Sequence, residues 1–254
     1  MPRLRVSSVQ SNIYWENPER NRSHLKRLIA GIKNTDLIVL PELFASAFSV
    51  SYKAEMMHGE SMRWMRKVAE DKQAAVIGSL IVLDEGKKYN RLIWMNQDGS
   101  YYFYDKRHLF GMMNEERYFT AGKKRLIVDY KGWRVCPLIC YDLRFPVFSR
   151  NTDNYELLIY IANWPVSRIE HWDSLLLSRA IENQSYVLGV NRVGCDNKGV
   201  EFDGHSCLID FNGKVLYRDY HNESVKTTEI SKSNLLKSRA KFPFLNDIDS
   251  FKID

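Results

Sequence analysis

WRVCPLICYDLRFP, residues 133–146, joins two stretches of opposite character. Residues 133–139 form a short apolar run with β-branched and aromatic side chains, which favours a buried strand. Residues 140–146 are more polar and end at a proline, so Cys140 stands at a sharp change from strand to turn. A thiol at such a turn has exposed backbone N–H groups beside it, which can lower its pKa and bind an oxyanion. The position is typical of a nucleophile elbow.

Two other reactive side chains also follow expected strands. Glu42 lies in LPELF (residues 40–44), directly after the apolar run 36–40 that Pro41 stops. Burial there would raise the pKa of its carboxyl towards the range of a general base. Lys106 lies in YDKRHLF (residues 104–110), after an aromatic strand, and an ammonium in a dry pocket can stabilise a developing oxyanion.

Each of these three residues also has a simpler interpretation. Glu42 could face solvent or cap a backbone amide, and Lys106 could be a surface charge beside Asp105. Cys140 could be a buried core cysteine, although that role fits Cys136, Cys195 and Cys207 better. Taken singly, the three signals are weak.

Hydrophobic periodicity along the rest of the chain predicts more strands than helices, in a single layered α/β domain. Strands are expected at residues 4–10, 36–40, 74–83, 89–95, 101–104, 125–128, 133–139, 156–162, 186–193, 207–211 and 214–217. Helices are expected after Asn17-Pro18, after a Ser61 cap, over 169–183 and near 233–240. Asn212-Gly213 predicts a type I′ hairpin turn. We expect one domain, residues 1–254, with a C-terminal tail from about residue 241.

Charge, apolar segments and histidine spacing limit the kinds of ligand and partner that we expect. The 37 Lys and Arg against 31 Asp and Glu give a net charge of +6, and the basic residues are scattered, which favours a small anionic substrate over nucleic acid. No signal peptide or long apolar segment stands out, so we expect a cytoplasmic protein without a membrane partner. The histidines lack metal-ligand spacing, and we expect no metal site.

Together, Glu42, Lys106 and Cys140 resemble the Glu-Lys-Cys triad of the nitrilase (carbon-nitrogen hydrolase) superfamily, in that chain order. Supporting matches are ANWP (residues 162–165), RAIEN (179–183), and GHS (204–206) followed by DFNG (210–213). The likeness extends from about residue 3 to about residue 240. It implies a four-layer α-β-β-α sandwich, no cofactor, and homodimers or larger homo-oligomers that pair through outer helices.

The resemblance also implies a second glutamate before a Gly-containing turn. Glu115 and Glu116 both precede Gly122, and the spacing favours Glu115, with Glu116 in reserve. The loop 111–114 has no clear match, and loops of this kind shape the substrate pocket. Glu42 is then the general base, Lys106 and the backbone N–H of Tyr141 stabilise the oxyanion, and Cys140 forms a thioester.

The phrases CYDLRFP and KRHLF look most like the omega-amidase branch, which deaminates 2-oxoglutaramate and 2-oxosuccinamate. We therefore expect the substrate to contact Arg144, Tyr141 and Phe44, with Arg144 binding its distal carboxylate. Arg144 could instead pair with Asp142 or a helix end. The alternatives in function are a nitrilase, an N-carbamoyl amidohydrolase or a general aliphatic amidase with the same triad, or a non-catalytic protein that keeps the fold.

Overall fold

The computed structural model describes residues 2–252, in which the strands form two sheets. Sheet 1 consists, in spatial order, of β13 (Ser224–Ser231), β1 (Arg3–Gln10), β2 (Leu37–Val39), β3 (Ala75–Asp84), β4 (Lys87–Met95) and β5 (Tyr101–Asp105). Sheet 2 consists of β10 (Val193–Cys195), β11 (Glu201–Ile209), β9 (Tyr186–Asn191), β8 (Leu157–Ala162), β7 (Trp133–Ile139) and β6 (Val128–Tyr130), with β12 (Val215–Tyr220) paired to β11.

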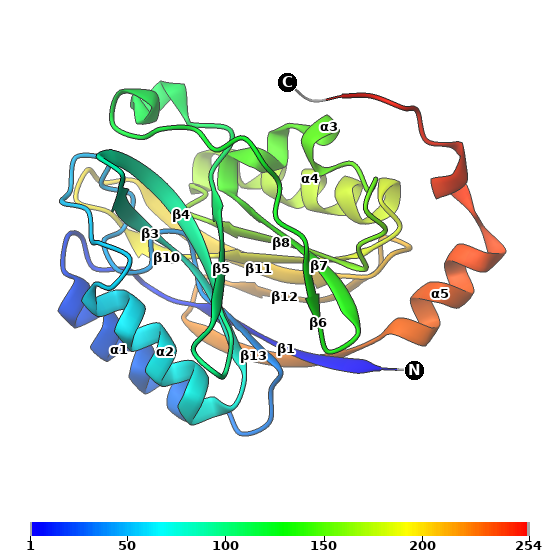
Figure 1. The fold of residues 1–254 in the computed structure, drawn as a ribbon, viewed down its shortest axis with the longest axis horizontal. Helices are drawn as coiled ribbons and strands as arrows, with labels where there is room; N and C mark the ends of the chain where they lie inside the picture. The colour runs from blue at the N-terminus through cyan, green and yellow to red at the C-terminus, as the bar shows by residue number, and fades with distance from the viewer. Residues whose placement is uncertain (1, 253–254) are drawn as a thin grey trace.

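Helices cover the outer face of each sheet. The α-helices are α1 (Pro18–Ala30), α2 (Glu60–Lys72), α3 (Pro146–Ser149), α4 (Ile169–Glu182) and α5 (Lys232–Lys241). Figure 1 shows α1 and α2 on one side of the molecule, and α3 and α4 on the other. The expected four-layer α-β-β-α sandwich is therefore confirmed, because the two sheets face each other between these helices.

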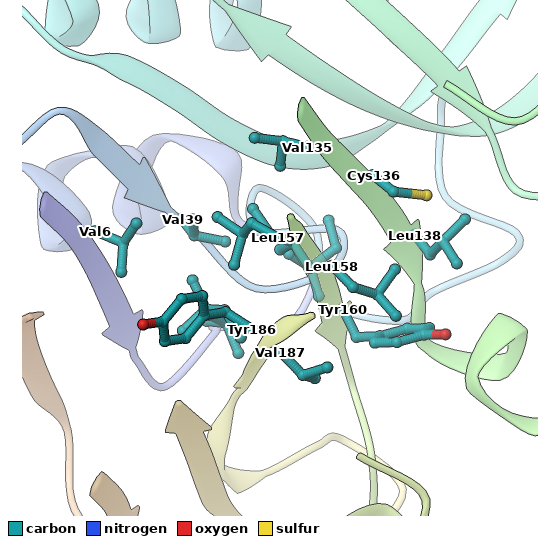
Figure 2. Packing of buried hydrophobic residues seen from close by; sticks show 14 of the residues in the cluster. Val6, Val39, Val135, Cys136, Leu138, Leu157, Leu158, Tyr160, Tyr186 and Val187 are labelled. Atoms are coloured by element: carbon teal, nitrogen blue, oxygen red, sulfur yellow. The ribbon is translucent and has the colours of Figure 1, made fainter. Parts of the chain in front are cut away.

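The central layer of the core lies between the two sheets. Val6 and Val39 of sheet 1 belong to the same buried cluster as Leu157 and Tyr186 of sheet 2, and Figure 2 shows them close together. A second cluster fills the space between sheet 1 and its two helices. Strands such as β2 and β8 are buried along their whole length, which explains why they appear in the sequence as continuous apolar runs.

The structure corrects three local predictions. The turn at Asn212-Gly213 is not type I′: of these two residues only Gly213 has a positive φ, 84°, and the Asp210 carboxylate accepts the N–H groups of Asn212 and Lys214 in a longer connection. Ser61 does not begin α2, since Gly59 precedes the first turn and Glu55 accepts the N–H of Ser61. Strand β13 was not predicted, because only one of its residues, Ile230, is buried and the segment therefore has no apolar pattern in the sequence.

Four strands, β2, β5, β7 and β8, place their carboxyl ends around one region. β2 and β3 are parallel in sheet 1, and β7, β8 and β9 are parallel in sheet 2. The short 3-10 helices η1 (Gly111–Met113) and η2 (Glu115–Arg117) follow β5, η3 (Cys140–Arg144) follows β7, and η4 (Val166–Arg168) follows β8. The fifth, η5 (Phe244–Asp247), belongs to the segment after α5, which Figure 1 shows passing towards α3. Loops at the carboxyl ends of such strands are where α/β proteins bind ligands.

Candidate active site

A buried lysine joins two glutamates from different segments. The Lys106 ammonium donates to Glu42 Oε1 at 2.9 Å and to Glu115 Oε2 and Oε1 at 2.9 and 3.1 Å. Glu42 follows β2, Lys106 follows β5, and Glu115 lies in η2. None of the three residues is more than 1% exposed. Glu116, the reserve candidate, is exposed, so the structure places Glu115 and not its neighbour in this cluster.

Two asparagines that the sequence analysis did not assign hold the carboxylates. Asn90 on β4 donates its amide to Glu42 Oε1 at 2.9 Å and to Glu115 Oε1 at 3.2 Å. The backbone N–H of Asn163, just after β8, donates to Glu42 Oε2 at 2.9 Å. Asn163 belongs to the ANWP match, which could have identified it. Asn90 lies inside a strand and carries no such signal.

Backbone geometry at Glu42 explains why this loop residue is buried. Pro41 ends the strand run, and the next residue, Leu43, takes a positive φ of 47°. The N–H of Leu43 is held by the Ser79 hydroxyl at 2.8 Å on the neighbouring β3. The turn therefore folds back over sheet 1 and directs the Glu42 carboxylate towards Lys106 and away from solvent.

Burial and ion pairing have opposite effects on the pKa values of the charged groups in this cluster. Burial alone would lower the pKa of Lys106, but Glu115 and Glu42 together raise it above its usual value, so the ammonium stays charged. Burial raises the pKa of Glu115, with Lys106 acting in the opposite direction. Two carboxylates and one ammonium thus share a site with almost no exposure to solvent.

Cys140 lies at the turn between β7 and η3 and has a positive φ of 42°, a strained conformation for a residue with a Cβ. The fully buried carboxylate of Asp142 holds this turn, accepting from the Ile139 N–H at 3.0 Å, the Tyr104 hydroxyl at 2.7 Å and the His108 N–H at 3.1 Å. The turn is thereby tied to the segment that carries Lys106.

The Cys140 thiol faces the same buried charges. Burial and then the negative charge of Glu42 raise the pKa of Cys140 well above its usual range, while Lys106 acts to lower it. Burial and Glu42 thus favour the thiol over the thiolate. Its Sγ lies 4.0 Å from the carbonyl oxygen of Asn163.

Cys140 and Lys106 both line one cavity of about 230 Å³. Tyr141 and Arg144 line it as well. Phe44 does not: its ring is fully buried in the core beside α2, 5.5 Å from the ring of Trp64, because the turn at residues 41–43 sends it to the outer face of sheet 1. The prediction that Phe44 contacts substrate in this cavity is therefore wrong. Aromatic walls that sequence reasoning missed are Phe48, Phe110, Trp164 and Phe202.

Within residues 2–252, no group of three or more His, Cys, Asp or Glu side chains is arranged to hold a metal ion. In the same part of the chain, no helix has the length and apolar character needed to cross a membrane. The chemistry that the geometry supports is nucleophilic attack by a thiol beside a carboxylate and an ammonium.

Comparison with known proteins gives the same class of chemistry. The carbon-nitrogen hydrolase family model matches residues 5–238. Omega-amidase YafV of Escherichia coli (strain K12) is 41% identical over all of both chains, and 2-oxoglutaramate amidase of Bacillus subtilis (strain 168) is 32% identical over 96% of each. The solved structure of XC1258 from Xanthomonas campestris, a CN-hydrolase superfamily protein with an arsenic adduct in the active site, is 42% identical over all of both chains, with a TM-score of 0.98.

The matches extend over nearly the whole chain and agree with the four-layer fold. They show that the protein is an amidase enzyme of the nitrilase type. The chain belongs to the carbon-nitrogen hydrolase family, the nitrilase superfamily, on its omega-amidase branch.

Proposed function

We propose that this amidase hydrolyses the omega-amide of a small dicarboxylic 2-oxo acid, such as 2-oxoglutaramate or 2-oxosuccinamate, to the acid and ammonia. One observation carries the proposal. Cys140 opens onto the same cavity as Lys106, whose ammonium bridges the buried carboxylates of Glu42 and Glu115. A nucleophile, a base and a fixed positive charge then act on one amide group.

The first half-reaction transfers the acyl group to sulfur. Glu42 takes the proton of the Cys140 thiol as the sulfur attacks the amide carbon, because burial raises the pKa of the thiol and disfavours a free thiolate. The oxyanion of the tetrahedral intermediate is stabilised by the Lys106 ammonium and the Tyr141 N–H, which lies in the first turn of η3 where N–H groups have no intrahelical partner. Glu42 returns its proton to the departing nitrogen, the C–N bond breaks, and ammonia leaves a thioester.

The second half-reaction reverses these roles. Glu42, again a carboxylate, takes a proton from the attacking water, and the same two donors hold the second oxyanion. The C–S bond then breaks, the sulfur recovers the proton from Glu42, and the carboxylic acid is released. One carboxylate thus serves as base and acid in both halves.

Glu115 acts on this cycle through Lys106. It supplies the second counter-charge that keeps the buried ammonium protonated, and its two oxygens fix the direction of the Nζ atom. Asn90 bridges Glu115 and Glu42, so the two carboxylates keep their spacing while Glu42 gains and loses a proton. We assign Glu115 and Asn90 as positioning residues.

We assign Arg144 to bind the substrate's distal carboxylate, at the end away from the reacting amide. Its guanidinium lines the cavity, lies 4.7 Å from the centre of the Trp164 ring, and contacts His171 Nδ1 at 3.2 Å. The alternative pairing of Arg144 with Asp142 does not occur, since Asp142 binds the turn and His108 instead. Two similar proteins carry the names omega-amidase and 2-oxoglutaramate amidase, which supports an acidic amide as substrate.

A panel of ammonia-release assays tests the proposal. The substrates are 2-oxoglutaramate, 2-oxosuccinamate, glutamine and a simple aliphatic nitrile, each with the native protein and with Cys140→Ser. We expect the two 2-oxo acid amides to be hydrolysed fastest and Cys140→Ser to release no ammonia. Faster turnover of glutamine or of the nitrile would refute the substrate assignment, and normal turnover by Cys140→Ser would refute the thioester.

We also propose a homodimer or larger homo-oligomer in the cytoplasm, with residues 1–254 forming one domain. Ile181 on α4 and Val215 and Leu216 of β12 are exposed apolar side chains, which supports pairing through outer elements such as α4. The four cysteines are free thiols, which suits a reducing compartment. Light scattering in solution and fractionation of cells are the tests.

A further inference from the structure

A second guanidinium lines the same cavity as Arg144. Arg168 ends η4, and its guanidinium carbon lies 5.6 Å from the centre of the Phe110 ring. Within residues 2–252, neither Arg144 nor Arg168 forms an ion pair with a carboxylate, whereas Lys106 in the same cavity contacts two. Two cations without counter-charges, set against aromatic walls, favour a ligand that carries a negative charge and further hydrogen-bond acceptors.

One acidic residue, Asp196, also lines the cavity, and one oxygen of its carboxylate binds backbone N–H groups of its own loop. Its Oδ1 accepts the N–H groups of Lys198 at 2.8 Å and Val200 at 3.0 Å, and so closes the loop between β10 and β11. Asp196 therefore shapes the wall of the cavity, and within residues 2–252 it forms no ion pair with Arg168. Within the described residues, no ion pair explains the position of Arg168 in the cavity wall.

We propose that Arg168 is a specificity-determining residue that recognises the 2-oxo group of the substrate, while Arg144 binds the adjacent carboxylate. The inference rests on the proposed function and deepens it. A 2-oxo acid end presents three acceptor oxygens, two of the carboxylate and one of the ketone. One guanidinium fork satisfies the carboxylate pair, and the ketone oxygen needs a donor of its own.

The same arrangement rejects 2-amino acids. In glutamine an ammonium replaces the ketone oxygen, so an acceptor becomes a positively charged donor facing a guanidinium. Like charges in a partly closed cavity repel, and the Arg168 donors lose their acceptor. Arg168 therefore separates 2-oxoglutaramate from glutamine, which has the same length and the same reacting amide.

Arg168→Gln tests the assignment in two assays. In ammonia release, kcat/KM for 2-oxoglutaramate should fall about 10- to 100-fold, the size expected for a hydrogen bond to a charged group. The value for the monoamide of glutaric acid, which lacks the ketone, should change by less than about threefold. In binding, measured by calorimetry on the Cys140→Ala background, Arg168→Gln should weaken 2-oxoglutarate by a similar factor and leave glutarate nearly unchanged.

Two matched variants control for charge and for folding. Arg168→Lys keeps the charge but lacks the planar fork, so it should fall between the native protein and Arg168→Gln. Arg3→Gln changes an arginine that is 71% exposed on β1 and should alter neither assay. Melting temperatures show that each variant is folded.

The outcomes separate this inference from the proposed function. Equal losses for the 2-oxo and the unsubstituted compounds, or no loss for either, would overturn the role of Arg168 even if native 2-oxoglutaramate turnover is fast. Absence of native turnover on any 2-oxo acid amide would overturn the proposed function. In that case the binding assay with 2-oxoglutarate and glutarate would still decide whether Arg168 recognises the ketone.

Discussion

The two ends of the cavity hold positive charge in opposite ways. At the closed end, Lys106 is 1% exposed and contacts two carboxylates. At the open end, Arg144 and Arg168 are partly exposed and form no ion pair with any carboxylate in residues 2–252. A buried cation must be paired, because desolvation is costly, whereas a half-exposed one can await a ligand.

This difference separates chemistry from recognition. The closed end acts on the C–N bond, which every amide substrate has in common, and its groups are fixed by one another before substrate arrives. The open end meets the part of the substrate that varies. Changes at the closed end should therefore reduce kcat on all substrates, and changes at the open end should act on KM for some of them.

Cys140→Ala tests the closed end with the largest expected effect. Removal of the nucleophile leaves no atom to form the thioester, so ammonia release should fall by about 10⁶, the loss seen when a nucleophile is removed from a comparable covalent mechanism. Cys195→Ser is the matched control, because Cys195 is exposed and outside the cavity lining. It should keep native activity. Ammonia release by Cys140→Ala within tenfold of native would break the distinction between the two ends.

Glu42→Gln should separate loss of turnover from loss of thiol reactivity. Turnover should fall by about 10² to 10⁴, since no group remains to shuttle the proton. The negative charge of Glu42 raises the pKa of Cys140, so its removal lowers that pKa, and Lys106 still favours the thiolate.

Alkylation of Cys140 by iodoacetamide measures this effect. In Glu42→Gln the pH midpoint of alkylation should lie below that of the native protein, and labelling should stay stoichiometric at neutral pH. A midpoint shifted upward would contradict the assigned charge of Glu42, and unchanged turnover would contradict its role as a base.

The sequence predicts the closed end better than the open end for a physical reason. Glu42, Lys106 and Cys140 each follow an expected strand, and the resemblance to the Glu-Lys-Cys triad, not the strand pattern, grouped the three. Asn90 gives no signal, because nothing distinguishes a strand asparagine that bridges carboxylates from one that faces solvent. Side-chain direction in a tight turn is also invisible, and for this reason Phe44 was wrongly expected in the cavity.

The open end is built from loops, where local pattern carries little information. Met112 and Met113 of η1, Arg168 of η4 and Val200 of the β10–β11 loop meet only in the folded chain. The segment 111–114 has no helical or strand periodicity in the sequence, yet it forms one wall. Loop conformation depends on tertiary contacts, so sequence pattern could not have placed these residues.

Glu115→Gln and Glu116→Gln form a matched pair of neighbours. Loss of the Glu115 charge removes one of the two counter-charges of Lys106 and lets the Nζ atom move, so kcat should fall by about 10²-fold, the cost of one oxyanion donor. Glu116 is exposed, and its substitution should change kcat by less than about twofold. Steady-state assays with 2-oxoglutaramate measure both. A larger effect at Glu116 would reassign the second glutamate.

Arg144→Ala tests the open end and has the smallest expected effect on the chemical step. Without the Arg144 guanidinium, the substrate carboxylate loses one pair of hydrogen-bond donors. KM for 2-oxoglutaramate should therefore rise about 10- to 100-fold while kcat changes little. KM for a neutral amide such as butanamide should stay within about twofold, because that substrate has no carboxylate. An equal loss on both substrates would show that Arg144 supports the fold through Trp164 and His171, and the division between a catalytic end and a recognition end would then rest on Arg168 alone.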